Sequence, residues 1–367
     1  MAERITLVLS GGSALGAYQG GVFEALHGRG LRPERIVGTS TGAVNAAIFA
    51  GNPPETRIES LRRFWDGAAR DGVAWSLGAG LWTDERARVL PSPLFGSPGV
   101  FRPRFPGGLS LLPGMPGDTS LYDLAPLRAS LERAVDFERL NSGDVRLTIV
   151  AVDVTTGEEV HFDTDKAPIG PDHLLACSGF IPFFPPVEID GRLLGDGGMA
   201  ANLPLEAALE ESSAEDRLCI AIDLFRRPGA RPRTVGQAMD RQLDLLLTSQ
   251  TTRALRSLRR VHDLRRHLRR LGERLPEDRR AEADIASALA EGARDGDGAT
   301  TILLLSHAPV PEDVELRAFD YSRPVLTGRW EAGRADTVEA LRGLEGHKAA
   351  PGEFILRVAG GGTQGDA

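Results

Sequence analysis

A serine at a turn between an apolar strand and an alanine-rich helix constrains the fold most. Residues 38–42 read Gly-Thr-Ser-Thr-Gly, at the junction of an apolar run (36–39) and a helical run (41–50). In this Gly-x-Ser-x-Gly context the serine occupies a sharp, strained turn with its hydroxyl exposed, and the helix directs free N–H groups toward it. Ser40 is therefore a candidate nucleophile, although such a serine can also be a simple helix N-cap.

The segments around this turn alternate between strand and helix. A strand over residues 5–9 and a helix over 17–27 precede it, which predicts a mostly parallel sheet. Further strand-like runs lie at residues 145–154, 218–224 and 300–305. We therefore predict an α/β fold in which one sheet collects all of these strands.

The loop after the first strand is rich in glycine. Residues 10–16 read Ser-Gly-Gly-Ser-Ala-Leu-Gly and begin the first helix, so their backbone amides can bind an anion. A dinucleotide-binding loop would need glycine at Ser13 and an acidic residue at the end of the second strand, and a phosphate-binding P-loop would need Gly-Lys-Ser/Thr. The second strand ends at a candidate nucleophile instead, so we interpret the loop as an oxyanion hole.

A serine nucleophile needs a base, which is usually histidine. Among the seven histidines, His307 is the strongest candidate, because it follows a late strand, where a Ser…Asp…His order would place it. The others are less suitable: His27 lies at a helix end, His161 and His173 precede the Asp196 segment, His262 and His267 lie on a basic helix, and His347 lies near the C-terminus.

Asp196 is the competing candidate for the base. It ends a short strand and is surrounded by glycines, in the run Leu-Leu-Gly-Asp-Gly-Gly-Met (193–199), which allows a carboxylate to approach another loop closely. An Asp-Gly hairpin turn is the alternative, but the length of the glycine run and the helix start that follows make it less typical of one. An ordinary aspartate, with a pKa near 3.9, is a poor base for a hydroxyl, so positioning and the oxyanion hole must carry most of the rate.

In this order, the three motifs resemble the patatin-like phospholipase family, which combines a glycine-rich oxyanion loop, a Gly-x-Ser-x-Gly turn and a distant Asp-Gly-Gly or Asp-Gly-Ala. The resemblance extends by motif over residues 5–225; residues 176–191 look like the segment that leads into the family's aspartate, and residues 319–333 look like the end of bacterial members. Two positions depart from the family pattern. Ser13 replaces a usual glycine, and Leu15 stands where many members have Arg or Lys.

The resemblance implies a three-layer α/β/α fold and a lipid acyl hydrolase of the phospholipase A type. Ser40 would be the nucleophile and Asp196 its proton acceptor and only partner, with no metal and no cofactor. The amides of Gly11, Gly12 and Ser13 would bind the oxyanion. Five further glycines would support these motifs: Gly16, Gly38, Gly42, Gly197 and Gly198. The alternatives are an esterase or thioesterase acting on soluble acyl compounds or storage polyesters, and a catalytically silent lipid-binding scaffold.

Composition limits the partners and the compartment. A formal net charge of -8 and a pI near 5.5 argue against nucleic-acid binding. Two cysteines, Cys177 and Cys219, provide neither a disulfide framework nor metal-ligand spacing. No window has the roughly 20 apolar residues of a membrane span and no signal peptide is evident. We therefore expect a cytoplasmic protein, with peripheral contact at the inner membrane face as a hypothesis; the oligomeric state is left open.

The chain is expected to divide into three parts: a catalytic core (1–230), a helical, basic extension with one further strand packed on the core (231–345) and a flexible tail (346–367). Residues 91–117 form a Pro- and Gly-rich loop with scattered apolar side chains, which can be a lid or lipid-facing mouth, or a loop packed on the body. Residues 236–291 are helical and arginine-rich, which suits either an anionic membrane or a solvated helix face.

Overall fold

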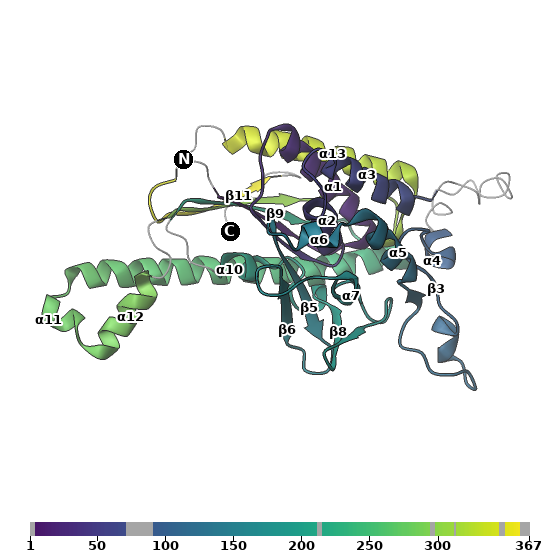
Figure 1. The fold of residues 1–367 in the computed structure, drawn as a ribbon, viewed down its shortest axis with the longest axis horizontal. Helices are drawn as coiled ribbons and strands as arrows, with labels where there is room; N and C mark the ends of the chain where they lie inside the picture. Colours follow the sequence, from purple (N-terminus) through teal and green to yellow (C-terminus); the bar gives the residue numbers. More distant parts are fainter. Residues whose placement is uncertain are drawn as a thin grey trace.

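The computed structural model describes residues 4–70, 91–210, 215–293, 298–311, 313–344 and 349–359, and within them a nine-stranded sheet runs through the molecule (Figure 1). The strand order is β11-β10-β9-β1-β2-β5-β8-β7, and β6 also pairs with β5. The strands have these bounds: β1 Arg4–Leu9, β2 Arg35–Thr39, β5 Arg146–Asp153, β6 Glu159–Asp163, β7 Val187–Ile189, β8 Arg192–Asp196, β9 Arg217–Asp223, β10 Thr300–Ser306 and β11 Phe354–Ala359.

The sheet is mostly parallel, as predicted. The pairs from β11 through β10, β9, β1 and β2 to β5 are parallel, and only β6, β7 and β8 pair antiparallel. Leu9, the last residue of β1, lies opposite Gly38 of β2 and Ile222 of β9. Because the carboxyl ends of parallel strands meet at one edge, the loops after β1 and β2 are neighbours.

Helices cover both faces of the sheet, which confirms the predicted three-layer arrangement (Figure 1). Leu7 and Leu9 of β1 face the larger core cluster, whereas Val8 faces the smaller one. Several helices cover the larger cluster, among them α1 Ala17–Gly28, α2 Thr41–Ala50, α3 Arg57–Ala68 and α13 Arg323–Leu344. Two helices cover the smaller cluster: α9 Leu205–Leu209 and α10 Val235–Arg274.

The C-terminal helix α13 is an integral part of the core. It packs along α1 at very short range: a Cβ atom at Gly21 would lie 1.9 Å from the Trp330 carbonyl oxygen, and one at Gly333 would lie 2.0 Å from the Tyr18 carbonyl oxygen. Only glycine allows the two backbones to come this close. The chain after residue 230 supplies two sheet strands, β10 and β11, and two covering helices, α10 and α13.

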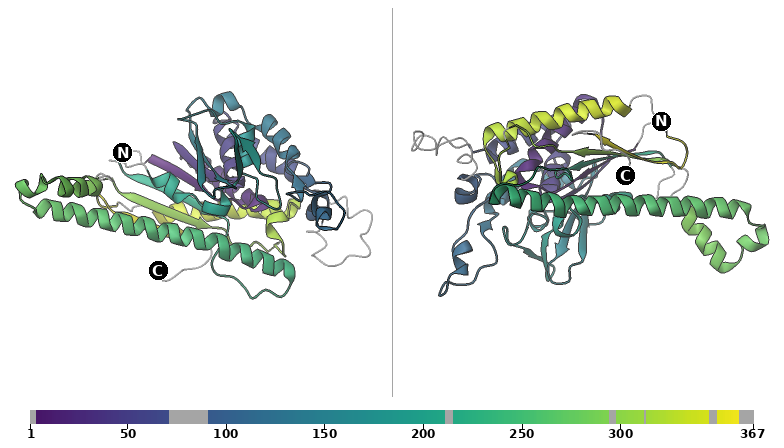
Figure 2. Two further views of the ribbon diagram at one scale, coloured as in Figure 1. Left: turned by 90° about the horizontal axis from the view of Figure 1, so that it is seen from below. Right: turned by 180° about the vertical axis from the view of Figure 1, so that it is seen from behind.

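The basic region is helical, as predicted, and is dominated by α10. At about 1.5 Å per residue its 40 residues extend about 60 Å. Its first part packs on the sheet, and its arginine-rich end projects beyond the body, where the short helix α11 (Glu277–Arg280) and α12 (Ala283–Ala293) fold back along it (Figure 2). None of the helices in the described ranges is long and apolar enough to span a bilayer.

The predicted loop at residues 91–117 belongs to a longer excursion from the body, residues 91–123, which contains short elements (Figure 1). These elements are α4 Pro91–Phe95, β3 Arg102–Pro103, the 3-10 helix η4 Gly107–Leu111 and β4 Tyr122–Asp123, which pairs with β3. Its return end is fixed, because the N–H groups of Leu121 and Tyr122 donate to the carbonyls of Pro182 and Phe183 at 3.0 and 2.9 Å. Its tip exposes apolar side chains.

The prediction of a flexible tail from residue 346 is wrong for residues 354–359. These residues form β11, which pairs in parallel with β10. The composition of the surrounding segment, with Pro351, Gly352 and a glycine run after Ala359, hides a short β-forming sequence. An unpaired edge of β10 gives this sequence a partner, which composition alone does not reveal.

The remaining helices connect these layers or line the site: η1 Ser13–Gly16, α5 Ala125–Ala134, α6 Phe137–Leu140, α7 Pro171–Ala176, α8 Gly198–Ala201 and η5 Arg317–Phe319.

Candidate active site

Ser40 occupies the turn between β2 and α2, at the carboxyl edge of the sheet. Its φ of 54° and ψ of −126° are rare for a residue other than glycine and carry a cost of about 1–3 kcal/mol. The turn stays this sharp because its glycines lie against backbone: a Cβ at Gly42 would be 2.5 Å from the Leu9 carbonyl oxygen, and one at Gly38 would be 2.8 Å from the Ala43 nitrogen. The predicted strained turn is thus present.

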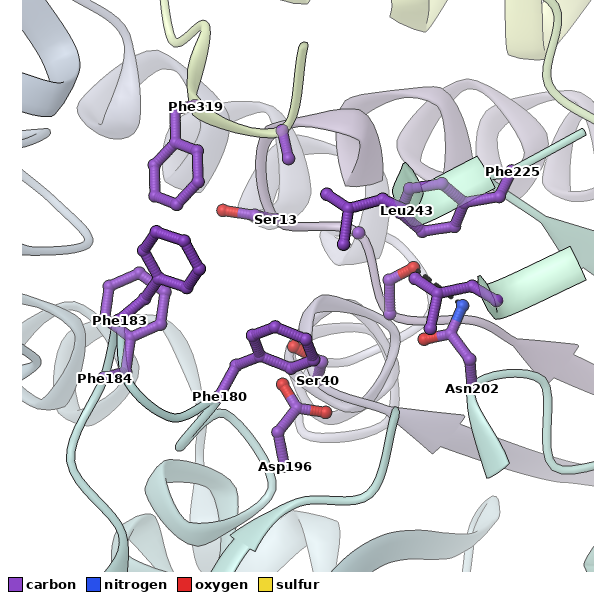
Figure 3. Close-up of a pocket in the computed structure, with 14 residues that line it drawn as sticks. Ser13, Ser40, Phe180, Phe183, Phe184, Asp196, Asn202, Phe225, Leu243 and Phe319 are labelled. Atoms are coloured by element: carbon purple, nitrogen blue, oxygen red, sulfur yellow. Dashed lines mark hydrogen bonds between the residues drawn. The ribbon is translucent and has the colours of Figure 1, made fainter. Parts of the chain in front are cut away.

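The structure brings Asp196 to Ser40. Asp196 ends β8 opposite Ala151 of β5. Its carboxylate lies beside Ser40 in the same cavity (Figure 3) and accepts a hydrogen bond from the Gly198 N–H at 2.8 Å. A Cβ at Gly197 would lie 2.3 Å from the Val150 carbonyl oxygen, so the glycine run lets this segment lie directly on β5. Asp196 is therefore not a hairpin-turn residue exposed to water.

Burial changes the acid–base properties of Asp196. The residue is 2% exposed, and desolvation raises its pKa to about 7, while the neighbouring Ser40 hydroxyl and Gly198 N–H act in the opposite direction. The expectation from the sequence, an ordinary aspartate and hence a poor base, is corrected by this environment. A carboxylate with a pKa near 7 is well matched to proton transfer at neutral pH.

The glycine-rich loop lies directly against Ser40, because a Cβ at Gly11 would be 2.8 Å from the Ser40 Cβ. The Gly11 N–H donates to the Asn202 carbonyl at 3.3 Å, so this amide already has an acceptor. The amides of Gly12 and Ser13 have none among the described residues. Of the three predicted donors, two are therefore open to an anion in this conformation.

Ser13 adopts the backbone conformation that glycine favours, with φ of 52°. Its hydroxyl lies 2.8 Å from the Tyr321 hydroxyl, which anchors the residue from the other end of the chain. The second departure from the family pattern has a different consequence: Leu15 is completely buried in the larger core cluster. No positive charge occupies this position.

A buried hydrogen-bond network fixes the loop to α2 and α3. Gln19 donates to the Ser10 carbonyl at 2.8 Å, and Asn45 donates to the Gln19 side chain and the Gly16 carbonyl, each at 2.9 Å. The Trp65 indole N–H completes the chain by donating to Asn45 at 3.0 Å. Because every member is satisfied and removed from water, the network rigidifies the loop. Sequence reasoning missed these residues.

An apolar cavity of about 510 Å³, including its opening to solvent, contains the serine and the aspartate (Figure 3). Aromatic side chains from separate segments form much of its wall, including Phe180, Phe183 and Phe184 before β7 and Phe319 in η5, and Leu243 of α10 also lines it. The family-like segments at 176–191 and 319–333 therefore supply walls, a role that the sequence did not indicate.

His307 does not reach this site. It is 1% exposed, packs 4.8 Å from the Tyr18 ring between centroids, and lies 3.9 Å from the Asp313 carboxylate. Burial and then the charge of Arg329 lower its pKa to about 3, so it stays neutral. None of the described histidines lines the cavity, and His347 lies outside the described residues.

The described residues contain no group of three metal-ligating side chains, and Cys177 and Cys219 are buried and free.

Comparison with known families decides the membership of the chain. The model of the patatin-like phospholipase family matches residues 7–209, more than half of the 367 residues, and a second family model, described as patatin phospholipase, matches residues 247–350. The chain belongs to the patatin-like phospholipase family. This membership supports a lipid hydrolase function, and the second match covers most of the α10–α13 region.

The individual proteins that the chain resembles share limited sequence identity with it. The uncharacterised protein YqhO of Bacillus subtilis is 29% identical over 240 residues, which span 62% of this chain and 73% of YqhO. Among solved structures, VipD of Legionella pneumophila is 14% identical with a TM-score of 0.38, over 93% of this chain and 67% of VipD. Human GIVD cytosolic phospholipase A2 is 21% identical with a TM-score of 0.23, over 44% of this chain and 22% of that protein.

Proposed function

We propose that the protein hydrolyses acyl ester bonds of lipids, with Ser40 as nucleophile and Asp196 as its only catalytic partner. The placement of the buried Asp196 carboxylate beside the strained Ser40, with both side chains lining one cavity, is the observation that supports this most directly. Two open amides beside the serine add to it.

The steps follow from the placement of these groups. Asp196 takes the proton of the Ser40 hydroxyl as its oxygen attacks the ester carbonyl carbon, and the amides of Gly12 and Ser13 donate to the oxyanion. The intermediate collapses, the alcohol leaves with the proton from Asp196, and the acyl group stays on Ser40. Water then attacks the acyl-enzyme with Asp196 again as base, which releases the fatty acid and returns the proton to Ser40.

The apolar surface near the cavity supports a lipid as the substrate. Ten of the fifteen exposed large apolar side chains of the described residues lie on two segments, the 91–123 excursion and the first third of α10: Leu94, Phe95, Phe105, Leu109, Leu111, Leu112, Val235, Met239, Leu245 and Leu246. Both segments lie at the same end of the molecule (Figures 1 and 2). Leu243, on the same helix, lines the cavity. This end therefore suits peripheral contact with a bilayer, which delivers lipid directly to Ser40.

The proposal is tested by assaying purified protein against phospholipid vesicles and against a short p-nitrophenyl ester. Ser40→Ala is the matched control. We expect release of fatty acid from the vesicles and covalent labelling by a fluorophosphonate, both absent in S40A. Hydrolysis of the short ester alone would favour an esterase for soluble acyl compounds. No labelling and no hydrolysis would favour a catalytically silent scaffold.

A further inference from the structure

A second cavity adjoins Ser40 from another side. Its volume is about 400 Å³ including its opening, and it lies among α2, α3 and the start of α5. Its walls are mainly apolar, with Val44, Phe64, Trp65, Leu124 and Leu127 among them. Nothing in the catalytic steps above uses this space.

The two cavities meet at the nucleophile. Ser13, Ser40 and Phe184 line both of them, so these three residues mark the boundary between the two spaces. Asp196 lines the first cavity and not the second. The acid–base group therefore faces one side of Ser40 only.

This asymmetry decides how an ester can lie across the serine. The leaving alcohol oxygen must receive its proton from Asp196, and the water of the second half-reaction must give its proton to the same carboxylate. Both must therefore approach from the first cavity. With the oxyanion directed to the Gly12 and Ser13 amides, the acyl chain is left with the remaining direction, which opens into the second cavity.

We propose that the second cavity binds the acyl chain of the substrate and that the first binds the alcohol part. This assignment rests on the proposed function and adds to it the division of the substrate between the two spaces. Both cavities are apolar enough for an acyl chain, so the position of Asp196 decides the assignment. The far wall of the second cavity is rigid. Trp65 is held by the hydrogen bond to Asn45 and by edge-to-face contact with Phe64, 5.4 Å between ring centroids.

A rigid apolar cavity makes hydrolysis depend on acyl length. Each methylene that the cavity buries should raise kcat/KM roughly fourfold, the equivalent of ~0.8 kcal/mol, until the chain reaches the wall. Val44 of α2 is 3% exposed and lines only the second cavity, so Val44→Phe fills space that the acyl chain would occupy. Leu243→Phe is the matched variant, because Leu243 lines only the first cavity.

The experiment measures kcat/KM for p-nitrophenyl esters from acetate to dodecanoate, where only the acyl chain changes, and then for octanoate esters of different alcohols. We expect V44F to lower the ratio of dodecanoate to acetate by about 10-fold or more, and L243F to leave this ratio unchanged while altering the preference among alcohols. Val44→Ala should move the optimum toward longer chains, which a folding defect would not do.

The opposite pattern, with L243F shortening the acyl preference and V44F changing the preference among alcohols, would overturn the assignment. An unchanged acyl profile in both V44F and V44A would also overturn it. Failure of the proposed function has a different signature, because the wild-type protein would then neither react with a small fluorophosphonate nor hydrolyse any ester of the series.

Discussion

The hydroxyls of Ser13 and Tyr321 lie 2.8 Å apart and join the first loop of the chain to the residue pair that precedes α13. Ser13 has a φ of 52°, which is unfavourable for any residue with a side chain. Burial raises the pKa of Tyr321 to about 12, so its hydroxyl keeps its proton at neutral pH. The hydrogen bond therefore anchors a strained residue whose amide we place at the oxyanion.

Tyr321→Phe removes this anchor. We expect the free energy of unfolding to fall by about 1 kcal/mol, the usual contribution of one hydrogen bond. We also expect kcat to fall about 10-fold, equivalent to ~1.4 kcal/mol of transition-state stabilisation, because the Ser13 amide is no longer held in place. Steady-state kinetics with a p-nitrophenyl ester and urea unfolding give the two quantities.

Ser13→Gly in the Tyr321→Phe background separates positioning from packing. Glycine adopts the observed φ without an anchor, so the double variant should recover most of the lost kcat. If the double variant is as slow as Y321F, the hydrogen bond does not act through the conformation of residue 13.

Ser40→Ala and Asp196→Asn should each lower kcat by at least ~10³-fold, since one removes the nucleophile and the other the base. His307→Ala should leave kcat of the folded protein nearly intact, although it empties space in the core and lowers stability. A stopped assay with the three variants at matched folded concentration makes the comparison. A loss in H307A as large as that in S40A would contradict the dyad and point to a triad.

The exposed tip of the 91–123 excursion should contribute to binding of lipid bilayers. Leu111 is 86% exposed and Phe105 78% exposed, so Phe105→Glu with Leu111→Glu replaces apolar contact by charge without disturbing the core. We expect binding to vesicles of phosphatidylcholine and phosphatidylglycerol to fall about 10-fold or more, with hydrolysis of a short soluble ester retained. Sedimentation with the vesicles measures the bound fraction.

Leu271→Glu is the control for this surface, because Leu271 is also exposed, at 59%, but lies near the far end of α10. It should bind vesicles like the wild-type protein. Equal losses in both variants would show that the excursion has no special part in docking.

The sequence was sufficient to predict the five parallel strands at the centre of the sheet and to single out Ser40 and Asp196 as candidates, because both leave local signals. β1, β2, β5, β9 and β10 were each predicted within two residues of their observed bounds, since buried strands are short apolar runs between turn residues. Ser40 and Asp196 were found because glycines beside a polar residue indicate close backbone approach. The observed distances at Gly42 and Gly197 provide the physical reason for these glycines.

Features that depend on distant segments were not predictable in this way. Phe183 and Phe319 are 136 positions apart, and their rings meet 5.1 Å apart only because η5 returns to the site. The Asn202 carbonyl accepts the hydrogen bond of the Gly11 N–H, and no sequence motif indicates this contact. The pKa of Asp196 likewise depends on its burial by the surrounding segments, a tertiary property.

That raised pKa predicts how activity depends on pH. The ionised carboxylate is the base, so kcat/KM should rise with pH through about 7 and level off above it. A profile that is flat from pH 5 to pH 9 would contradict Asp196 as the base.

The same pKa predicts an opposite dependence of stability on pH. An unfolded aspartate has a pKa near 3.9, so between about pH 4 and pH 7 the folded protein binds a proton at Asp196 that the unfolded chain does not. The free energy of unfolding therefore loses the contribution of Asp196 as pH rises through this window, by up to about 4 kcal/mol at about 1.4 kcal/mol per pKa unit.

The variant Asp196→Asn tests this dependence. Asparagine cannot ionise, so the variant should become more stable than the wild-type protein as pH increases from 5 to 8. Other buried groups, including Asp223 and His307, titrate in both proteins and cancel in the difference. Urea unfolding of both proteins across this range measures it, and a difference that does not change with pH would mean that Asp196 is ionised with an ordinary pKa in the folded state.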